Sequence, residues 1–60
     1  MDKEMYYALL QGMYHENLAK SCEALGKGDS EKRKYYEDRS YVLYDCLQKV
    51  KKEINSDSER

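Results

Sequence analysis

The sequence lacks most of the features that indicate a chemical activity. It has no Pro, Trp or Phe, a single His and two Cys among 60 residues, so its aromatic content consists of seven tyrosines. No stretch matches a catalytic motif, a metal-ligand spacing or a phosphate-binding loop. His15 has Gln11 and Ala19 one helical turn away, so no second ligand completes a metal pair. We therefore expect no enzymatic activity, no cofactor and no metal site.

An excess of charge of one sign is also missing. Lys and Arg number 11 and Asp and Glu number 12, which gives a net charge of -1. A strong binder of nucleic acid or anionic membrane would usually be more basic. No apolar run approaches the roughly 20 residues that cross a bilayer, and residues 1–4 lack the order of a signal peptide. The expected location is the cytoplasm, without membrane contact, and reducing conditions there would keep both cysteines as thiols.

Two amphipathic patterns of similar length are present, and they predict an all-α fold. They are separated by Gly26-Lys27-Gly28-Asp29-Ser30, which indicates a single domain over residues 1–60 that forms an antiparallel two-helix hairpin. The first helix is expected over about 2–25, the turn over 26–30, the second helix over about 30–54, and a frayed polar tail over 55–60. Gly26 is expected to adopt the left-handed conformation, and Asp29 or Ser30 to cap the second helix.

Steps of three and four residues define one apolar line on each helix. The first line contains Lys3, Tyr7, Leu10, Tyr14, Leu18, Ser21 and Leu25, and the second contains Tyr36, Leu43, Leu47, Val50 and Ile54, interrupted by Arg39 and Ser40. Four pairs are expected to lie level with each other: Tyr7 with Val50, Leu10 with Leu47, Tyr14 with Leu43, and Ser21 with Tyr36. The central core is therefore predicted to be Leu10, Tyr14, Leu43 and Leu47.

Further apolar residues lie beside both lines, and a single line of contact between the two helices, the seam, would leave them exposed. They are Met5, Tyr6, Leu9 and Met13 on the first helix, and Tyr35, Val42 and Cys46 on the second. Two helices that touch along a single seam bury too little apolar surface to offset roughly 1.5 kcal/mol of entropy for each ordered residue. We therefore predict that these residues mediate self-association of two hairpins into a four-helix bundle. A hetero-complex in which a partner supplies the missing helices would satisfy the same requirement.

The two cysteines are predicted not to form a disulfide within the chain. Level pairing places Cys46 opposite a residue near position 11, which lies about 16 Å along the helix axis from Cys22. Both cysteines are expected to be small buried hydrophobic residues.

Two tyrosines on the second helix are the predicted contacts to a partner protein. Tyr41 and Tyr44 lie off the apolar line, and tyrosine is enriched in protein interfaces. Burial of both side chains at the dimer interface is the alternative. The alternative contacts are the basic residues Lys32, Arg33, Lys51 and Lys52, which lie toward the two ends of the second helix and could touch the phosphates of RNA.

In outline the chain resembles the Rop family of plasmid-encoded antisense-RNA-binding proteins, which also has about sixty residues, two helices, a short turn and a polar tail. The resemblance implies a dimeric bundle, but no run of side chains corresponds to that family's RNA-facing residues. Ser40-Tyr41-Val42-Leu43-Tyr44 can also be compared with the Ser-Gln-Glu-Leu-Asp motif of the aspartyl-phosphate phosphatases that regulate sporulation in bacilli. It matches only at Ser40 and Leu43, and Asp45 comes one position late.

The expected function is that of a small regulatory or adaptor protein of bacterial or phage type, which binds a larger protein and could inhibit it. RNA binding by a Rop-like dimer is the alternative, and a structural subunit of a hetero-assembly is the third hypothesis.

Overall fold

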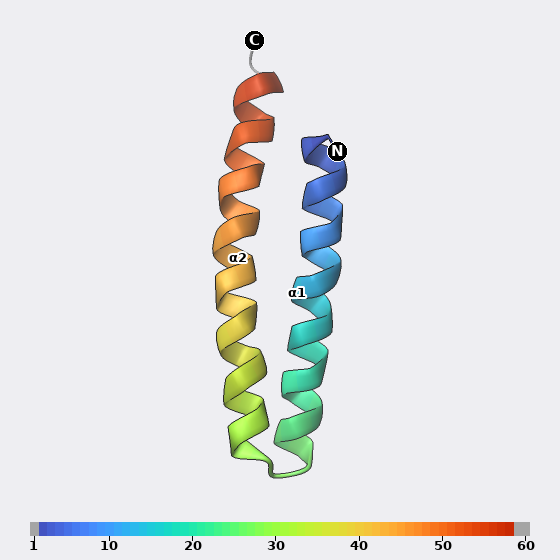
Figure 1. Ribbon diagram of the computed structural model, residues 1–60, viewed down its shortest axis with the longest axis vertical. Coiled ribbons are helices and arrows are strands. Elements are labelled where there is room, and N and C mark those ends of the chain that lie inside the picture. The colour runs from blue at the N-terminus through green and yellow to red at the C-terminus, as the bar shows by residue number, and fades with distance from the viewer. Residues whose placement is uncertain (1, 59–60) are drawn as a thin grey trace.

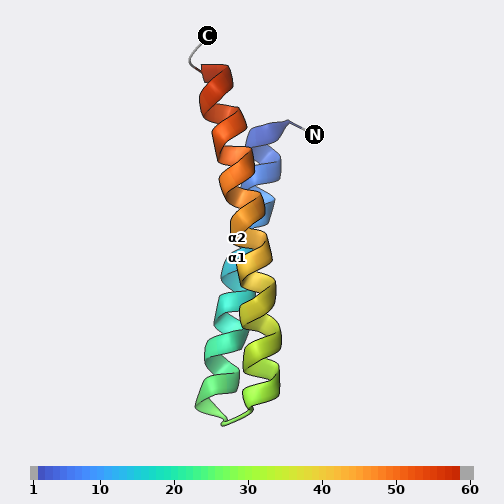
Figure 2. The same cartoon turned by 90° about the vertical axis from the view of Figure 1, so that its left-hand side faces the viewer.

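Two antiparallel helices joined by a tight turn make up the fold. The structure is a computed structural model that describes residues 2–58, with α1 at Lys3–Gly26 and α2 at Ser30–Ser58. The helices lie side by side along their whole common length, and the hairpin measures 49 × 15 × 14 Å (Figure 1, Figure 2). The predicted all-α antiparallel hairpin is confirmed. The described part of the chain contains no helix long and apolar enough to cross a membrane.

The second helix is longer than the sequence suggested. Residues 55–58 were expected to fray, but α2 continues through Ser58 and extends past the start of α1 (Figure 1). Residues 59 and 60 of the predicted tail lie outside the described residues. Each added residue gains one backbone hydrogen bond once a helix has formed, and the segment contains neither Pro nor Gly to stop it.

Asp2 caps the start of α1. Its backbone is extended, and its Oδ1 accepts a hydrogen bond of 2.7 Å from the Met5 amide. Glu4 places further negative charge in the first turn, where the helix dipole favours it. At this end of the hairpin Lys3 Nζ lies 3.9 Å from Glu53 Oε2, an exposed ion pair that joins the two helices.

The turn is closed by Gly28 and not, as predicted, by Gly26. Gly26 is the last residue of α1, and Gly28 has the positive φ of 74°. The Gly28 amide donates to the Leu25 carbonyl at 3.1 Å and the Asp29 amide to the Ala24 carbonyl at 2.9 Å. This is the Schellman pattern, which needs a left-handed residue at that position. Asp29 then caps α2 as predicted, because its Oδ1 accepts from the Lys32 amide at 3.1 Å.

The seam between the helices follows a seven-residue repeat on both sides. Its residues are all buried or half-buried: Tyr7, Tyr14 and Ser21 with Leu10, Asn17 and Ala24 on α1, and Tyr36, Leu43 and Val50 with Ser40, Leu47 and Ile54 on α2. Such a repeat keeps two helices in contact over many turns. The register is the predicted one, since Leu10, Leu47 and Val50 form the core cluster, with Tyr7, Tyr14 and Leu43 packed against it.

The repeat explains one error in the predicted line. Leu25 was placed in the seam, but it is 65% exposed and Ala24 is buried in its place. The predicted line advanced by four residues from Tyr14 to Leu18 and again from Ser21 to Leu25. The seven-residue repeat advances by three residues at both places, so the predicted line ended one position too far along the chain. Near the turn the buried seam residues are small: Ser21, Ala24 and Ser40, which is only 1% exposed.

Candidate functional site

Much of the apolar surface lies outside the core. Within the described residues, the buried hydrophobic side chains are Leu10, Ala24, Leu47 and Val50. Nine large hydrophobic residues are exposed, namely Met5, Tyr6, Leu9, Met13, Leu25, Tyr35, Tyr41, Val42 and Tyr44. This excess of exposed over buried apolar residues indicates a binding surface.

Most of these residues share one side of the hairpin. Tyr6, Leu9 and Met13 each directly precede a seam residue of α1, and Tyr35, Val42 and Cys46 each directly precede a seam residue of α2. Two antiparallel helices are related by a two-fold axis that is perpendicular to the plane containing both of them. Residues that directly precede the seam on either helix therefore point to the same side of that plane. Together with Met5, one turn before Leu9, they form what we call the apolar face.

Of the seven predicted self-association residues, all but Met5 directly precede a seam residue and so point to this side, and Met5 lies at its outer edge, one turn before Leu9. Six of them are between 45% and 64% exposed, and Cys46 is half-buried against the core cluster. The face is widest at the end of the hairpin away from the turn, where Met5, Tyr6, Leu9 and Met13 lie. Toward the turn the apolar face continues as a strip of mixed charge, in which the Glu16 and Lys20 side chains form an ion pair at 3.3 Å.

Residues that follow the seam form the opposite side, which we call the tyrosine face. The Tyr14 ring lies 5.5 Å from the His15 ring and 5.9 Å from the Tyr44 ring. Tyr41, one turn before Tyr44 along α2, is 61% exposed, and Tyr44 is 48% exposed. The predicted partner-binding pair is therefore accessible. Tyr44 was expected well away from the seam, but its ring lies against Tyr14 of α1.

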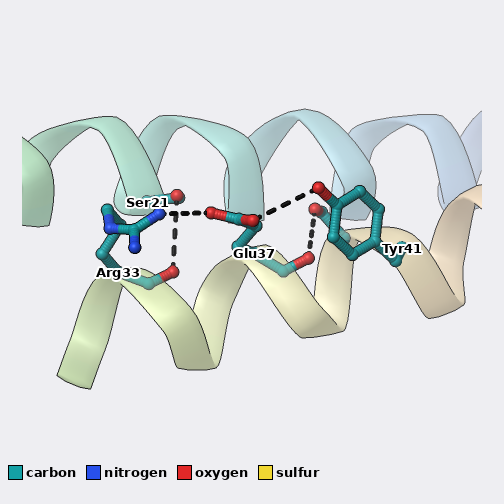
Figure 3. Close-up of polar contacts among 5 residues, drawn as sticks. Ser21, Arg33, Glu37 and Tyr41 are labelled. Atoms are coloured by element: carbon teal, nitrogen blue, oxygen red, sulfur yellow. Dashed lines mark hydrogen bonds and ion pairs between the residues drawn. The ribbon is translucent and has the colours of Figure 1, made fainter. Parts of the chain in front are cut away.

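A row of polar contacts along α2 holds Tyr41 in place (Figure 3). Arg33 Nη1 lies 2.6 Å from Glu37 Oε2, and the Tyr41 hydroxyl donates to Glu37 Oε1 at 3.2 Å. This hydrogen bond to a carboxylate, together with its negative charge, raises the pKa of Tyr41. The i, i+4 spacing of the three residues was visible in the sequence, although the row was not predicted.

Two buried serines complete the contacts around this row. The Ser21 hydroxyl donates to the Arg33 carbonyl at 3.5 Å, which links α1 to α2 (Figure 3). The Ser40 hydroxyl donates to the Glu37 carbonyl at 2.6 Å. Ser40 was predicted to interrupt the apolar line, but it is a seam residue whose polar atom is satisfied within its own helix.

The basic residues of the RNA alternative do not gather on one surface. Arg33 is paired with Glu37, and Lys32 lines an open recess beside the turn with Lys20, Lys27 and Tyr36. Lys51 and Lys52 are exposed near the far end of α2. In the recess a 2.9 Å hydrogen bond between Lys27 and Glu23 lowers the pKa of Glu23 and raises the pKa of Lys27, so these charges compensate each other.

The two cysteines are free thiols in different environments. Cys46 is half-buried at the edge of the core, but Cys22 is exposed, so the prediction that both are buried was wrong for Cys22. Cys22 directly follows the seam residue Ser21, and that position turns its side chain outward. No group of His, Cys, Asp and Glu among residues 2–58 could hold a metal ion.

No known protein family, curated protein or solved structure matches this chain. The geometry of the two faces is therefore the basis for assigning a function.

Proposed function

We propose that this chain is a small adaptor or regulatory protein that acts by contact. Two hairpins associate through the apolar face into a four-helix bundle, and the tyrosine faces of that bundle bind a larger protein. The observation that carries the proposal is the distribution of apolar side chains, since four are buried and nine large ones are exposed within the described residues.

Self-association accounts for the apolar face. A hairpin with so few buried hydrophobic residues gains little stability from the contact between its own two helices. A second hairpin would remove Leu9, Met13 and Val42 from water. Burial of each of these side chains is favourable by about 1.5 to 3 kcal/mol when complete.

The tyrosine face has the character of a contact surface for a different protein. Tyr41 and Tyr44 present large rings with few rotatable bonds, and tyrosine is frequent among the residues that dominate binding energy. The hydrogen bond from Tyr41 to Glu37, at 3.2 Å, orders one ring before binding, which lowers the entropy cost of association.

The test is capture of partners from a cell lysate, followed by measurement of affinity for the protein that is captured. The double variant Tyr41→Ala/Tyr44→Ala should bind at least about tenfold more weakly, with its helicity unchanged. The matched control is Asp45→Ala/Lys52→Ala, which removes two exposed side chains on the outer side of α2, opposite the seam, without altering net charge and should bind normally.

Two results would contradict the proposal. One is normal binding by the tyrosine variant. The other is a complex that ribonuclease destroys, that weakens steeply with salt, and that is lost when Lys32, Arg33, Lys51 and Lys52 are replaced. That second result would identify the chain as an RNA-binding protein.

A further inference from the structure

The apolar face carries two rows of residues that match each other in order. From the far end toward the turn, α1 presents Tyr6, Leu9, Met13, Glu16 and Lys20, and α2 presents Lys49, Cys46, Val42, Arg39 and Tyr35. Each residue directly precedes a seam residue, and the seam residues are paired in register. The corresponding members of the two rows therefore lie within about 3 Å of the same level along the hairpin.

We infer that the second copy of the chain packs with its turn at the same end, so that α1 of each copy lies on α2 of the other. A two-fold axis parallel to the helices produces this arrangement, and every helix is then antiparallel to both of its neighbours. This inference rests on the self-association proposed above and specifies its geometry.

The side chains that this arrangement brings together are chemically complementary. Five pairs of residues meet between the copies, each of them twice: Tyr6 with Lys49, Leu9 with Cys46, Met13 with Val42, Glu16 with Arg39, and Lys20 with Tyr35. The apolar residues meet apolar residues, and an acid meets a base. The two lysines meet aromatic rings, where cations are attracted to the π face.

The charged groups in these contacts are already positioned beside the face. Arg39 lies over its own Tyr35, 5.5 Å from the ring centroid, and Lys20 lies 5.5 Å from the Tyr36 ring and 3.3 Å from Glu16. Arg39 can therefore reach Glu16 of a second copy by a rotation of its side chain. Two apolar faces that meet with their turns at the same end can only place α1 on α2, because α1 on α1 in that orientation would require a mirror image of the chain.

The area of the face also fits a second copy. A side about 36 Å long, the length of α1, and 15 Å wide has roughly 540 Å² of projected area, and the protruding side chains raise its accessible surface toward the about 800 Å² that each partner contributes to a standard interface. The reverse orientation, with the turns at opposite ends, would centre the interface on the wide part of the apolar face near Leu9. Tyr35 and Lys20, which lie toward the turn, would then overhang without a partner.

Disulfide crosslinking distinguishes these arrangements. All variants carry Cys22→Ser, which leaves Cys46 as the single native thiol. In Leu9→Cys/Cys22→Ser, mild oxidation should link residue 9 of one copy to Cys46 of the other and give a covalent dimer. Within one hairpin these two side chains point to the same side and not toward each other, so their Cβ atoms stay separated by nearly the full distance between the helix axes, about 8 to 10 Å. A disulfide needs Cβ atoms about 4 Å apart.

The control is Cys22→Ser alone, which should remain uncrosslinked because the two copies of Cys46 lie on diagonally opposite helices. Efficient linkage of Cys46 to Cys46 would show the reverse orientation and overturn the inference. A dimer in solution that forms no link between residues 9 and 46 would also overturn it, while leaving self-association intact. A monomeric wild-type chain would overturn both proposals.

Charge reversal provides a second test that leaves the folded hairpin in place. Glu16→Lys and Arg39→Glu should each weaken dimerisation by about tenfold, because each occurs twice in the dimer, and the double variant should recover most of the loss. Sedimentation equilibrium measures the dimer, and circular dichroism verifies the helices. Additive losses in the double variant would contradict a contact between these two residues.

Discussion

Truncation of three leucines that differ in burial should separate the core from the surface. Leu47 is 5% exposed and packs against Leu10 and Val50. Leu47→Ala removes three carbon groups, worth about 0.8 kcal/mol each, and leaves a cavity, so it should cost about 2.5 to 4 kcal/mol of unfolding free energy. Leu43 is half-buried at the edge of the same cluster, and Leu43→Ala should cost about half as much.

Leu25 supplies the matched control, because it undergoes the same chemical change at a position that is 65% exposed. Leu25→Ala should alter the unfolding free energy by no more than about 0.5 kcal/mol. Urea denaturation followed by circular dichroism at 222 nm, at one protein concentration for all variants, gives the three values. Equal losses for Leu47→Ala and Leu25→Ala would refute the register of the seam.

Three further predictions concern the turn and the polar row. Gly28→Ala should destabilise the fold by about 1 kcal/mol because Gly28 has a positive φ, whereas Gly26→Ala, in a helical position with open space around it, should stabilise the fold by about 0.5 to 1 kcal/mol. Thermal denaturation measures both changes, and a loss of stability in both variants would contradict the assignment of Gly28 as the left-handed residue. Asp29→Ala should cost about 1 kcal/mol, with most of it restored by Asp29→Asn; equal losses would exclude the cap. The pKa of Tyr41, followed by NMR, should lie above that of an unperturbed tyrosine, and Glu37→Gln should lower it by removing the carboxylate charge; an unchanged pKa would show that the hydrogen bond does not form in solution.

The main features of the fold could be predicted from residue spacing. Apolar residues at steps of three and four define the two helices, and Gly-Lys-Gly-Asp-Ser is too polar and too rich in glycine to continue either one. The register was inferred from the position of the turn, which places Leu10 about level with Leu47. The excess of apolar residues beyond one seam was also visible, and it identified the residues of the apolar face.

Details that depend on a shift of one residue were not predictable by the same means. Gly26 and Gly28 are equally free to take a positive φ, and the backbone hydrogen bonds that close the turn select Gly28. Ala24 and Leu25 are adjacent, and hydrophobicity favoured the wrong one. Tyr44 lies against Tyr14 because a long aromatic side chain at the edge of the seam can reach the neighbouring helix.

The state of association of the chain tests the central claim most directly. Sedimentation equilibrium of the wild-type protein should give the mass of a dimer, with helicity that falls on dilution. Leu9→Glu/Met13→Glu, which places charge on the apolar face, should give a monomer of reduced helicity. A wild-type chain that has the mass of a monomer and keeps its full helicity on dilution would contradict the account.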